Sequence, residues 1–465
     1  MSKQERASAD TVISVLKQRF PARVETGGEM RRQHANTVTW LDNQPPDVVV
    51  FAEATQDVAD VVGIAAAYEM PVIAFGGGTS LEGQVNAPHG GISLDLSRMT
   101  RIVAVHADDL DATVEAGVTR VQLNQHLRDT GLFFPVDPGA ESATLGGMAA
   151  TRASGTNAVR YGTMRENVVS VTAVLADGSI VKTGGRARKS AAGYDLTRLL
   201  VGSEGTLGII TELTVRLYGQ PEKTAAAVCA FASVAAAATV TMQAMQLGGL
   251  ALARIELLDS LQIKAVNAYS KLRLEPAPTL FVEFHGSAEG LGPQVDMFRD
   301  IAIENGARSF EMASDEDERR RLWKARHDAY WATKAAWPGR QTLATDVCVP
   351  ISRLAECIAQ TEADIARLGL VSPIVGHVGD GNFHATPVID PDNAGERAAM
   401  EEFLGRLAAR AIAMEGTCTG EHGIGQGKMV YLEKEFGKNG VAMMRAVKSA
   451  LDPKGILNPG KLLGR

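Results

Sequence analysis

Short apolar runs bounded by glycine and polar turn residues dominate the chain between residues 45 and 219. Runs of roughly four to eight residues rich in valine and isoleucine are typical of β-strands. The strands predicted in this way are residues 48–51, 72–75, 92–96, 102–105, 168–175 and 209–217. Between the first two, the apolar spacing over residues 57–68 predicts a helix with Thr55 as its N-cap. Because the predicted strands in this region far outnumber the helices, we expect an α+β domain and not a regular alternation of strands and helices.

The composition of the chain shifts after Gln220 and Pro221, where an alanine-rich stretch follows. The elements expected there are a helix at 233–247, a strand at 279–285, a helix that begins after Ser314 and a long helix at 394–415. Near the start of the chain, apolar positions at helical spacing predict a short helix before residue 23, and residues 457–461 predict a turn. The second half of the chain is therefore expected to form another α+β domain.

Length and composition limit the classes of protein. A chain of 465 residues is too long for one compact core, so two or three domains are expected. The net charge of −7 argues against nucleic acid as a partner, and four cysteines without CxxC spacing suit a reducing compartment. The N-terminus lacks a signal or transit pattern, and no run approaches the roughly 20 apolar residues of a membrane span. We therefore expect a cytoplasmic location, with peripheral contact at the inner face of the membrane left open.

Two histidines and a Glu-His pair form the most informative polar feature. His377 and His384 stand seven positions apart in the run HVGDGNFH, and Glu421 and His422 follow downstream in GEHGIG. Glycines let such turns bend tightly enough to direct both imidazoles at one point. Two imidazoles and a carboxylate are a usual ligand set for divalent ions, and three protein ligands leave a position for substrate. Taken one at a time, these residues are better explained as ordinary core histidines and a solvated carboxylate. Their occurrence together in two glycine-rich turns favours a metal site.

Three glycine-rich segments lie in the strand-rich half. The first, FGGGTSLEG at 75–83, follows a predicted strand. Its bare amides can close on a phosphate, although a strained hairpin explains the glycines equally well. The second segment, 135–157, almost lacks apolar side chains, and the third, 202–210, runs from a tight turn into a strand. Three such segments in one domain indicate an extended cofactor and not an isolated phosphate.

The motifs GGGTSLEG, PVDPGAESATLGGMAATRASG, GSEGTLGIITE, HVGDGNFH, GEHGIG and LNPGK, in this order, resemble flavoproteins of the vanillyl-alcohol-oxidase type. Within them the chain is similar to the FAD-linked D-2-hydroxyacid dehydrogenases, above all the D-lactate dehydrogenases that pass electrons to cytochrome or quinone. The segments LWKARH at 322–327 and TDVCVPISR at 345–353 are similar to that D-lactate group in particular. The resemblance covers nearly the whole chain.

The resemblance implies an α+β architecture: a two-subdomain FAD-binding domain of the PCMH and vanillyl-alcohol-oxidase type, followed by an α+β cap or substrate domain. The implied boundaries are an N-terminal helical segment at 1–44, the FAD-binding domain at 45–219 and the substrate and metal domain at 220–465. The C-terminal part of the last domain, about 435–465, is expected to pack back on the FAD domain and to return to the flavin.

The resemblance also implies the residues that bind FAD along its pyrophosphate, ribityl and flavin. They are Gly76, Gly77, Gly78, Thr79, Ser80, Gly83, Pro138, Gly139, Thr144, Gly147, Ser154, Gly155, Asn157, Glu204, Gly208, Ile210 and Asn458. Some relatives bond the flavin covalently through a histidine or cysteine in the first glycine-rich region. Residues 75–83 contain neither, so non-covalent FAD is expected.

The implied metal ligands are His377, His384 and Glu421, which would hold one divalent ion, zinc or manganese, with iron also compatible. His422 is implied as the base that takes the substrate's hydroxyl proton, and as a substrate contact. Arg326 is implied as the fork for the substrate carboxylate, and Asn382 as a further substrate contact. For an arbitrary arginine the commoner alternative is a surface ion pair, here with one of residues 316–318.

The implied reaction is oxidation of a D-2-hydroxy acid, most of all D-lactate to pyruvate, by hydride transfer from C2 to flavin N5. Relatives that act on D-2-hydroxyglutarate carry a lysine where Ala344 stands and a threonine where Tyr330 stands. A second substrate carboxylate would therefore be buried without a partner, which favours a monocarboxylate beside an apolar wall of Tyr330 and Trp331.

Several alternatives stay open. A D-2-hydroxyglutarate dehydrogenase or the FAD subunit of a glycolate oxidase are related activities, and a metallohydrolase is the alternative from another class. The electron acceptor is a cytochrome, a quinone or an electron-transfer flavoprotein, and the sequence does not determine the oligomeric state.

Overall fold

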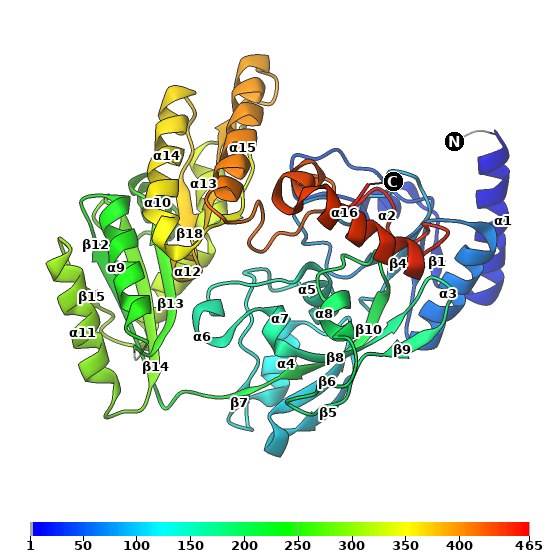
Figure 1. Cartoon of the computed structure of the whole chain (residues 1–465), viewed down its shortest axis with the longest axis horizontal. Helices are drawn as coiled ribbons and strands as arrows, with labels where there is room; N and C mark the ends of the chain where they lie inside the picture. The colour runs from blue at the N-terminus through cyan, green and yellow to red at the C-terminus, as the bar shows by residue number, and fades with distance from the viewer. Residues whose placement is uncertain (1–2, 249, 465) are drawn as a thin grey trace. The chain divides into compact units, whose positions relative to one another are not determined.

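The computed structural model describes residues 3–248 and 250–464; the parts of the predicted segments 1–44 and 220–465 that fall on Met1, Ser2, Gly249 and Arg465 lie outside the described residues. The chain divides into two compact units. The first unit contains residues up to Ser154, 162–220 and 421–465, and the second contains 155–161 and 221–420. Each unit combines helices with β-sheet, so the predicted α+β class is confirmed (Figure 1).

The first unit contains a small four-stranded sheet with the strand order β1-β2-β4-β3. Three of its strands, β2, β4 and β3, run parallel to one another. The strands are β1 (Val24–Glu25), β2 (Val48–Phe51), β3 (Val72–Phe75) and β4 (Ile92–Asp95). Val48, Val50, Ile92 and Leu94 are fully buried, because helices α1 (Lys3–Arg19) and α3 (Thr55–Tyr68) contribute apolar side chains to the same core. Strands covered on both sides are expected to be continuously apolar, as β2 is.

Helix α3 begins two residues before its predicted start. Thr55 was predicted as the N-cap, but it is the first helical residue, and Ala54 occupies the cap position without a side-chain hydrogen bond. The Thr55 hydroxyl instead donates to Oγ1 of Thr211 at 3.0 Å. The predicted cap is therefore wrong, because a contact from a distant strand engages the hydroxyl that would have capped the helix.

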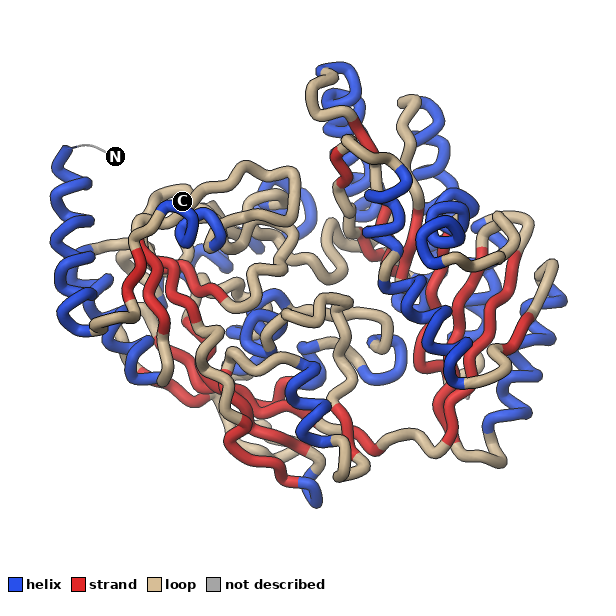
Figure 2. Tube along the Cα trace, turned by 180° about the vertical axis from the view of Figure 1, so that it is seen from behind, coloured by secondary structure: helices blue, strands red, loops and turns tan. Residues whose placement is uncertain are grey.

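The second sheet of the first unit is antiparallel, with the order β5-β6-β10-β8-β9, and Figure 2 shows its strands in red. The strands are β5 (Ile102–His106), β6 (Asp111–Glu115), β8 (Val168–Val174), β9 (Ile180–Lys182) and β10 (Ile209–Arg216); β7 (Leu132–Phe133) pairs separately with β11 (Tyr218–Gly219). The shorter helices of this unit are α2 (Gly28–Gln33), α4 (Arg120–Leu127), α5 (Leu145–Thr151), α7 (Met164–Asn167) and α8 (Leu196–Leu200). Residues of α4 and α5 share an apolar core with alternate residues of β6, β8 and β10.

The C-terminal segment belongs to the first unit. Helix α16 (Leu432–Leu451) is interrupted at Gly437, whose φ of 68° only a residue without a β-carbon adopts readily. After it, the chain pairs with β3: Val72 donates its N–H to the Ile456 carbonyl, and Asn458 donates to the Val72 carbonyl, each at 2.8 Å. The turn predicted at 457–461 is thus fixed to the edge of the parallel sheet.

The second unit is built on a seven-stranded sheet with the order β15-β12-β14-β13-β18-β19-β17. The strands of this unit are β12 (Lys223–Ala230), β13 (Leu252–Leu258), β14 (Thr279–Gly286), β15 (Glu311–Met312), β16 (Gln341–Thr342), β17 (Val347–Cys348), β18 (Ile374–Gly376), β19 (Asn382–Ala385) and β20 (Val388–Ile389). Its helices are α6 (Ala158–Tyr161), α9 (Val234–Gln246), α10 (Ser260–Ser270), α11 (Leu291–Glu304), α12 (Glu316–His327), α13 (Ala329–Ala336), α14 (Leu354–Arg367) and α15 (Ala394–Ala413).

Alternation along β14 separates the two faces of this sheet. Leu280, Val282 and Phe284 join an apolar core with residues of α9, α11 and α14, whereas Phe281 packs with residues of α10 and α12 on the other face (Figure 1). Charged residues of β13 and β14 occupy this second face beyond Phe281, since successive side chains of a strand point to opposite faces. Within residues 3–248 and 250–464, no helix combines the length and apolar character that a membrane crossing requires.

Candidate active site

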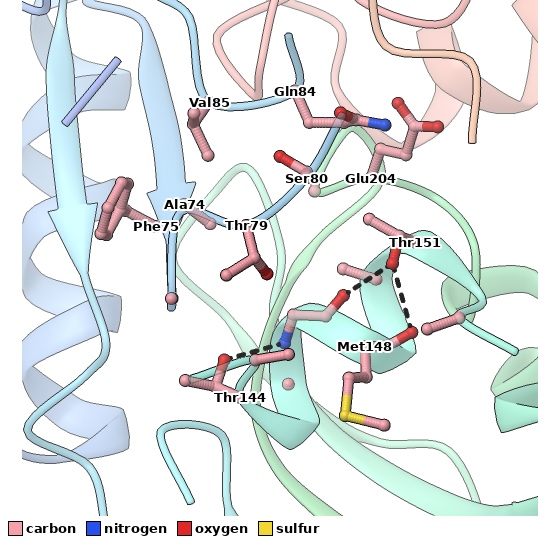
Figure 3. A pocket seen from close by; sticks show the side chains of 18 of the residues that line it. Ala74, Phe75, Thr79, Ser80, Gln84, Val85, Thr144, Met148, Thr151 and Glu204 are labelled. Atoms are coloured by element: carbon pink, nitrogen blue, oxygen red, sulfur yellow. Dashed lines mark hydrogen bonds between the residues drawn. The ribbon is translucent and has the colours of Figure 1, made fainter. Parts of the chain in front are cut away.

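A large pocket lies within the first unit, with an empty volume of about 1190 Å³ including its solvent-open part. Its walls come from many of the residues in the segments 74–85, 138–154 and 204–210, together with Leu96, Ala116, Glu421, His422 and Asn458. Figure 3 shows residues from the loop after β3, from α5 and from the turn before β10 facing the same space. A lining drawn from three separate segments suits an extended ligand better than a single phosphate.

The close approach of two loops explains the first glycines. A β-carbon at position 76 would collide with the Thr144 hydroxyl, and one at position 77 with the Ser142 carbonyl. Thr144 is the N-cap of α5 and accepts from the N–H of Gly147 at 3.2 Å, as Figure 3 shows. The glycines are therefore required by packing of the protein itself, whether or not a ligand lies against them.

One polar atom of the pocket points to a hydrogen-bonding ligand. The Ser80 hydroxyl is buried and has no hydrogen-bond partner among the described residues. Buried polar groups are almost always satisfied, so a hydroxyl left alone beside glycine amides indicates a polar ligand. These features fit the pyrophosphate of a dinucleotide cofactor.

Most of the cofactor-binding residues implied by the sequence lie in the wall of this pocket. Those in the wall are Gly76, Gly77, Gly78, Thr79, Ser80, Pro138, Thr144, Gly147, Ser154, Glu204, Gly208, Ile210 and Asn458. The structure does not place Gly83, Gly139, Gly155 and Asn157 there. Gly83 instead faces Gln426 and Leu41, and Asn157 belongs to the second unit, where its Oδ1 accepts from Arg254 Nε at 2.6 Å.

A buried carboxylate holds the turn that carries Glu421 and His422. The two oxygens of Glu204 accept the backbone N–H groups of Ile424 and Gly425 at 2.6 and 2.8 Å. Burial raises the pKa of Glu204, while these N–H groups and Lys461 act in the opposite direction. The turn is thereby fixed on the pocket wall by a residue from the third glycine-rich segment.

His422 is connected to the first glycine-rich segment in two ways. The Gln84 side chain donates Nε2–H to the His422 carbonyl at 2.8 Å. Nδ1 of His422 lies 3.9 Å from Oε1 of Glu82, which is too long for a hydrogen bond but close enough for charge attraction. Lys428 Nζ lies 3.3 Å from the same oxygen. The predicted base is therefore positioned by the loop predicted to bind the cofactor.

The C-terminal turn meets the same wall. Asn458 donates from Nδ2 to the carbonyls of Gln84 and Glu204, at 3.2 and 2.7 Å. Lys461, 2% exposed, donates to the Asn86 carbonyl, and burial lowers its pKa to about 7 while Glu204 opposes the shift. Residues more than 370 positions apart in sequence thus form one wall.

In the second unit, the predicted histidine ligands lie beside each other. His377 follows β18 and His384 lies on β19, so the antiparallel pairing of these strands brings them together. Their ring centroids are 5.4 Å apart, and the two ring planes are nearly perpendicular. One nitrogen of each ring lies within 4.8 Å of the other. Two imidazoles at this separation can bind a common divalent ion.

Each of these imidazoles has an acceptor for Nδ1. Nδ1 of His377 lies 2.8 Å from Oε1 of Glu256, and Nδ1 of His384 lies 2.7 Å from the Thr345 carbonyl. A carbonyl or carboxylate partner assigns the proton to Nδ1 and leaves the Nε2 lone pair for a metal. The tautomers inferred from these contacts are those of a metal-ligating pair.

Arg326 is buried and does not form the surface ion pair considered as its alternative. Its Nε donates to Oε2 of Glu256 at 2.8 Å, and Nη2 contacts the same oxygen at 2.5 Å. Burial alone would raise the pKa of Glu256, but the charge of Arg326, with His377, holds it below its usual range. Glu316 pairs instead with Arg319 and Arg320.

The segment before Glu421 is attached to the strands that carry the histidines. Asn382, next to His384 on β19, donates Nδ2–H to Oδ1 of Asp346 at 2.7 Å, and Thr419 donates its hydroxyl to the other oxygen. Gly420 approaches Asn382 so closely that a β-carbon would collide with its amide. Glu421 follows Gly420 by one peptide bond.

Sequence reasoning missed Glu82, Gln84 and Glu256. Glu82 lies within the first glycine-rich segment and Gln84 directly follows it, so their position in GGGTSLEGQ was a usable signal. Glu256 offered only a weak one, a carboxylate two positions after Arg254 in the mostly apolar strand LARIELL. Such a charge in a buried strand implies a partner, although sequence does not say which.

Two family models match the chain. One, described as an FAD binding domain, matches residues 46–184, and the other, described as FAD linked oxidases, C-terminal domain, matches residues 220–462. This chain is an FAD-linked oxidase. The predicted FAD cofactor is thereby confirmed at the level of the family.

Two relatives of the oxidase share high identity over most of the chain. A protein of Danio rerio described as a probable mitochondrial D-lactate dehydrogenase is 52% identical over 443 residues, which are 95% of this chain and 89% of the relative. A mitochondrial D-lactate dehydrogenase [cytochrome] of Arabidopsis thaliana is 46% identical over 418 residues, 90% of this chain and 73% of the relative. The predicted family is confirmed.

The oxidase also shares its fold with a solved structure. The 4-ethylphenol oxidase from Gulosibacter chungangensis, in an isoeugenol complex, superposes with a TM-score of 0.82 at 19% identity, covering 99% of this chain and 98% of that one. At this identity the likeness concerns the fold alone, and it confirms the predicted flavoprotein architecture.

The predicted location of the oxidase is wrong. A cytoplasmic protein was expected, whereas the Danio rerio and Arabidopsis thaliana relatives are both described as mitochondrial. The expectation rested on composition and on the pattern of the first residues. A cellular address is read by receptors from short segments and need not change the composition of the folded domain.

Proposed function

We propose that this oxidase converts D-lactate to pyruvate, with FAD as the hydride acceptor and one divalent metal ion. The observation that carries the proposal is that Glu421 and His422 line the same pocket as the three glycine-rich segments. A base in the wall of a flavin pocket suits removal of a proton from an alcohol that loses hydride to the flavin. The names of the Danio rerio and Arabidopsis thaliana relatives support D-lactate as the substrate.

The glycine-rich segments would hold FAD. Amides of residues 76–78 and the Ser80 hydroxyl would face the pyrophosphate, and the wall at 204–210 with Asn458 would face the flavin. Residues 75–83 contain no histidine or cysteine, which supports FAD bound without a covalent link.

His377 and His384 would bind the metal through Nε2, and Glu421 would supply a carboxylate oxygen. The Nδ1 contacts of both imidazoles support this assignment, because they orient the rings and leave Nε2 to the metal. Two imidazoles and one carboxylate suit zinc, manganese or iron, so the donor set does not choose among them. When bound, FAD accepts the hydride and the metal lowers the pKa of the substrate hydroxyl.

His422 would accept the hydroxyl proton. Its carbonyl is held by Gln84, and the Glu82 carboxylate, 3.9 Å from Nδ1, favours the imidazolium that forms when the proton arrives. The electron pair of the C2–H bond leaves as hydride, and the C2–O bond becomes the carbonyl of pyruvate.

Arg326 would bind the substrate carboxylate and fix its orientation. The Nδ2 of Asn382 already donates to Asp346 and to the Val347 carbonyl, so Asn382 would contact the substrate through its Oδ1. Glu256 engages the Nε and Nη2 of Arg326, which leaves Nη1 for a substrate oxygen. Ala344 supplies no positive charge for a second carboxylate, so a monocarboxylate is favoured over D-2-hydroxyglutarate. Trp331 is 53% exposed, so an apolar wall formed with Tyr330 would be open to solvent on one side. A cytochrome-type acceptor would reoxidise the flavin, as the name of the Arabidopsis thaliana relative suggests.

Anaerobic reduction of the bound flavin tests the proposal. The purified protein would be mixed with D-lactate, L-lactate, D-2-hydroxyglutarate and glycolate, before and after chelation. We expect loss of the visible flavin band with D-lactate, slower loss with the others, and little loss after chelation until metal is restored. A protein without flavin that nonetheless hydrolyses esters or amides would support a metallohydrolase, and preferential reduction by glycolate or D-2-hydroxyglutarate would contradict the proposed substrate.

A further inference from the structure

One buried carboxylate of the second unit contacts two residues of the proposed site. Glu256 on β13 is 1% exposed; its Oε1 lies 2.8 Å from Nδ1 of His377, and its Oε2 accepts from Nε of Arg326 at 2.8 Å. We propose that Glu256 is a positioning residue that orients the metal ligand and the carboxylate-binding guanidinium together. This inference rests on the proposed function, because it assigns a role to Glu256 only if His377 binds metal and Arg326 binds substrate.

The two histidines differ in what orients them. Nδ1 of His384 faces a main-chain carbonyl, that of Thr345, which no side-chain substitution removes. Nδ1 of His377 faces a side chain, Glu256, so its tautomer and ring orientation depend on one replaceable group. Outer partners of this kind set the affinity of a metal site.

The contact with Arg326 uses the other oxygen of the same carboxylate. The guanidinium is planar, so two contacts from Nε and Nη2 to Oε2 fix the direction of Nη1. A glutamine at position 256 would present one carbonyl oxygen and one NH₂ group. It could accept from His377 or from Arg326 but would turn a donor toward the other.

Glu283 on β14 provides a matched control. It is also 1% exposed, and its partners likewise include an arginine and a histidine, Arg319 at 2.8 Å and His285 at 2.9 Å, with a second arginine, Arg254, at 3.5 Å. Its described contacts include neither His377 nor Arg326. Replacing Glu283 by glutamine therefore removes an equivalent buried charge from the same face of the same sheet.

The test measures metal affinity as well as catalysis. Metal-free flavoprotein would be prepared for the wild type, Glu256→Gln, Glu256→Asp and Glu283→Gln. Each protein would be titrated with Mn²⁺ alone, and the free Mn²⁺ would be measured by its electron spin resonance. A second series would measure competition by Zn²⁺. Glu256→Gln is expected to weaken metal binding by about 10- to 100-fold and to raise KM for D-lactate even with saturating metal. Both glutamine variants should lose thermal stability to a similar degree, but Glu283→Gln should keep wild-type metal affinity and KM.

Glu256→Asp keeps the charge beside Arg326 and so protects folding, but it is one methylene too short to reach both partners. A smaller loss of metal affinity in this variant is expected, and it carries the test if Glu256→Gln does not fold. Wild-type metal affinity in both Glu256 variants, or an equal loss in Glu283→Gln, would overturn the positioning role. Wild-type protein that binds neither Mn²⁺ nor Zn²⁺ would overturn the proposed metal function itself, and the inference with it.

Discussion

Gln84 donates its side-chain amide to the main-chain carbonyl of His422 at 2.8 Å, although the two residues stand 338 positions apart. Gln84 follows the first glycine-rich segment, and His422 lies in the turn that Glu204 anchors through two backbone N–H groups. The proposed base is thus held from two of the glycine-rich segments at once. We therefore expect binding of the cofactor and placement of the proposed base to be coupled through the same wall of the first unit.

Removal of the proposed base should affect turnover and leave the cofactor in place. His422→Asn is expected to lower kcat with D-lactate by about 10²- to 10⁴-fold, the usual contribution of a general base. The asparagine keeps the backbone carbonyl that Gln84 binds, so the FAD content of the purified variant should match the wild type. Steady-state kinetics normalised to bound flavin checks this, and kcat within a few-fold of wild type would exclude His422 as the base.

A methyl group at Gly77 should disrupt the pocket, because its β-carbon would collide with the Ser142 carbonyl. Gly77→Ala is expected to lower the free energy of unfolding by about 1–3 kcal/mol and to reduce bound FAD. Gly185→Ala is the matched control, since its β-carbon meets no atom within 4 Å. Thermal melts and flavin-to-protein ratios of both variants give the comparison; equal behaviour would show that the loop can move aside.

Loss of one imidazole should remove the metal. His384→Ala deletes a ligand whose Nδ1 lies 2.7 Å from the Thr345 carbonyl, a main-chain group that the substitution leaves in place. The variant is expected to keep FAD, to lose bound Zn²⁺ or Mn²⁺ by elemental analysis, and to show no recovery when metal is added. Wild-type protein treated with a chelator should regain its activity when metal is added back. Full activity of metal-free wild-type protein would contradict the assignment.

Asp259 should make stability depend on pH. It caps α10 by accepting from the Gln262 N–H at 2.6 Å, and burial raises its pKa from 3.8 to about 7, with Glu362 adding to the shift and Gln262 opposing it. A raised carboxyl pKa means that the folded state binds the proton more tightly than the unfolded state. The contribution to stability is therefore present below about pH 4 and is lost as the pH rises to about 7.

Replacement of that carboxyl tests the direction of the effect. Asp259→Asn keeps a cap acceptor but cannot ionise, so it should be more stable than wild type at pH 8, by on the order of 1–3 kcal/mol, and similar at pH 4. Denaturant unfolding at the two pH values measures the difference. A variant less stable than wild type at pH 8 would show that the charged form of Asp259 is stabilising.

Pattern along the sequence was enough to predict seven of the twenty described strands, namely β2, β3, β4, β5, β8, β10 and β14, and the glycine-rich segments that line the pocket. Strands β2 (VVVF) and β3 (VIAF) are short apolar runs, which are typical of buried strands, whereas β4 (ISLD) alternates apolar and polar residues. The histidine pair could be predicted because HVGDGNFH contains a turn that places His377 directly after β18 and His384 on the neighbouring strand β19. These signals are local, so one sequence is sufficient to read them.

The partners of those residues could not be predicted in the same way. The contact of Glu256 with His377 spans 121 positions, and it depends on the pairing of β13 with β18. The cap at Thr55 failed for a related reason, since Thr211 from a distant strand engages its hydroxyl. Long-range pairing decides which polar group meets which, and a single sequence contains no direct record of it.

The most direct measurement is the primary isotope effect on anaerobic flavin reduction by D-lactate, with hydrogen or deuterium at C2, in the metal-loaded wild type. If hydride leaves C2 for the flavin, deuterium should slow loss of the flavin band several-fold, and one pyruvate should form for each flavin reduced. Flavin that remains oxidised in the presence of D-lactate would contradict the proposed reaction.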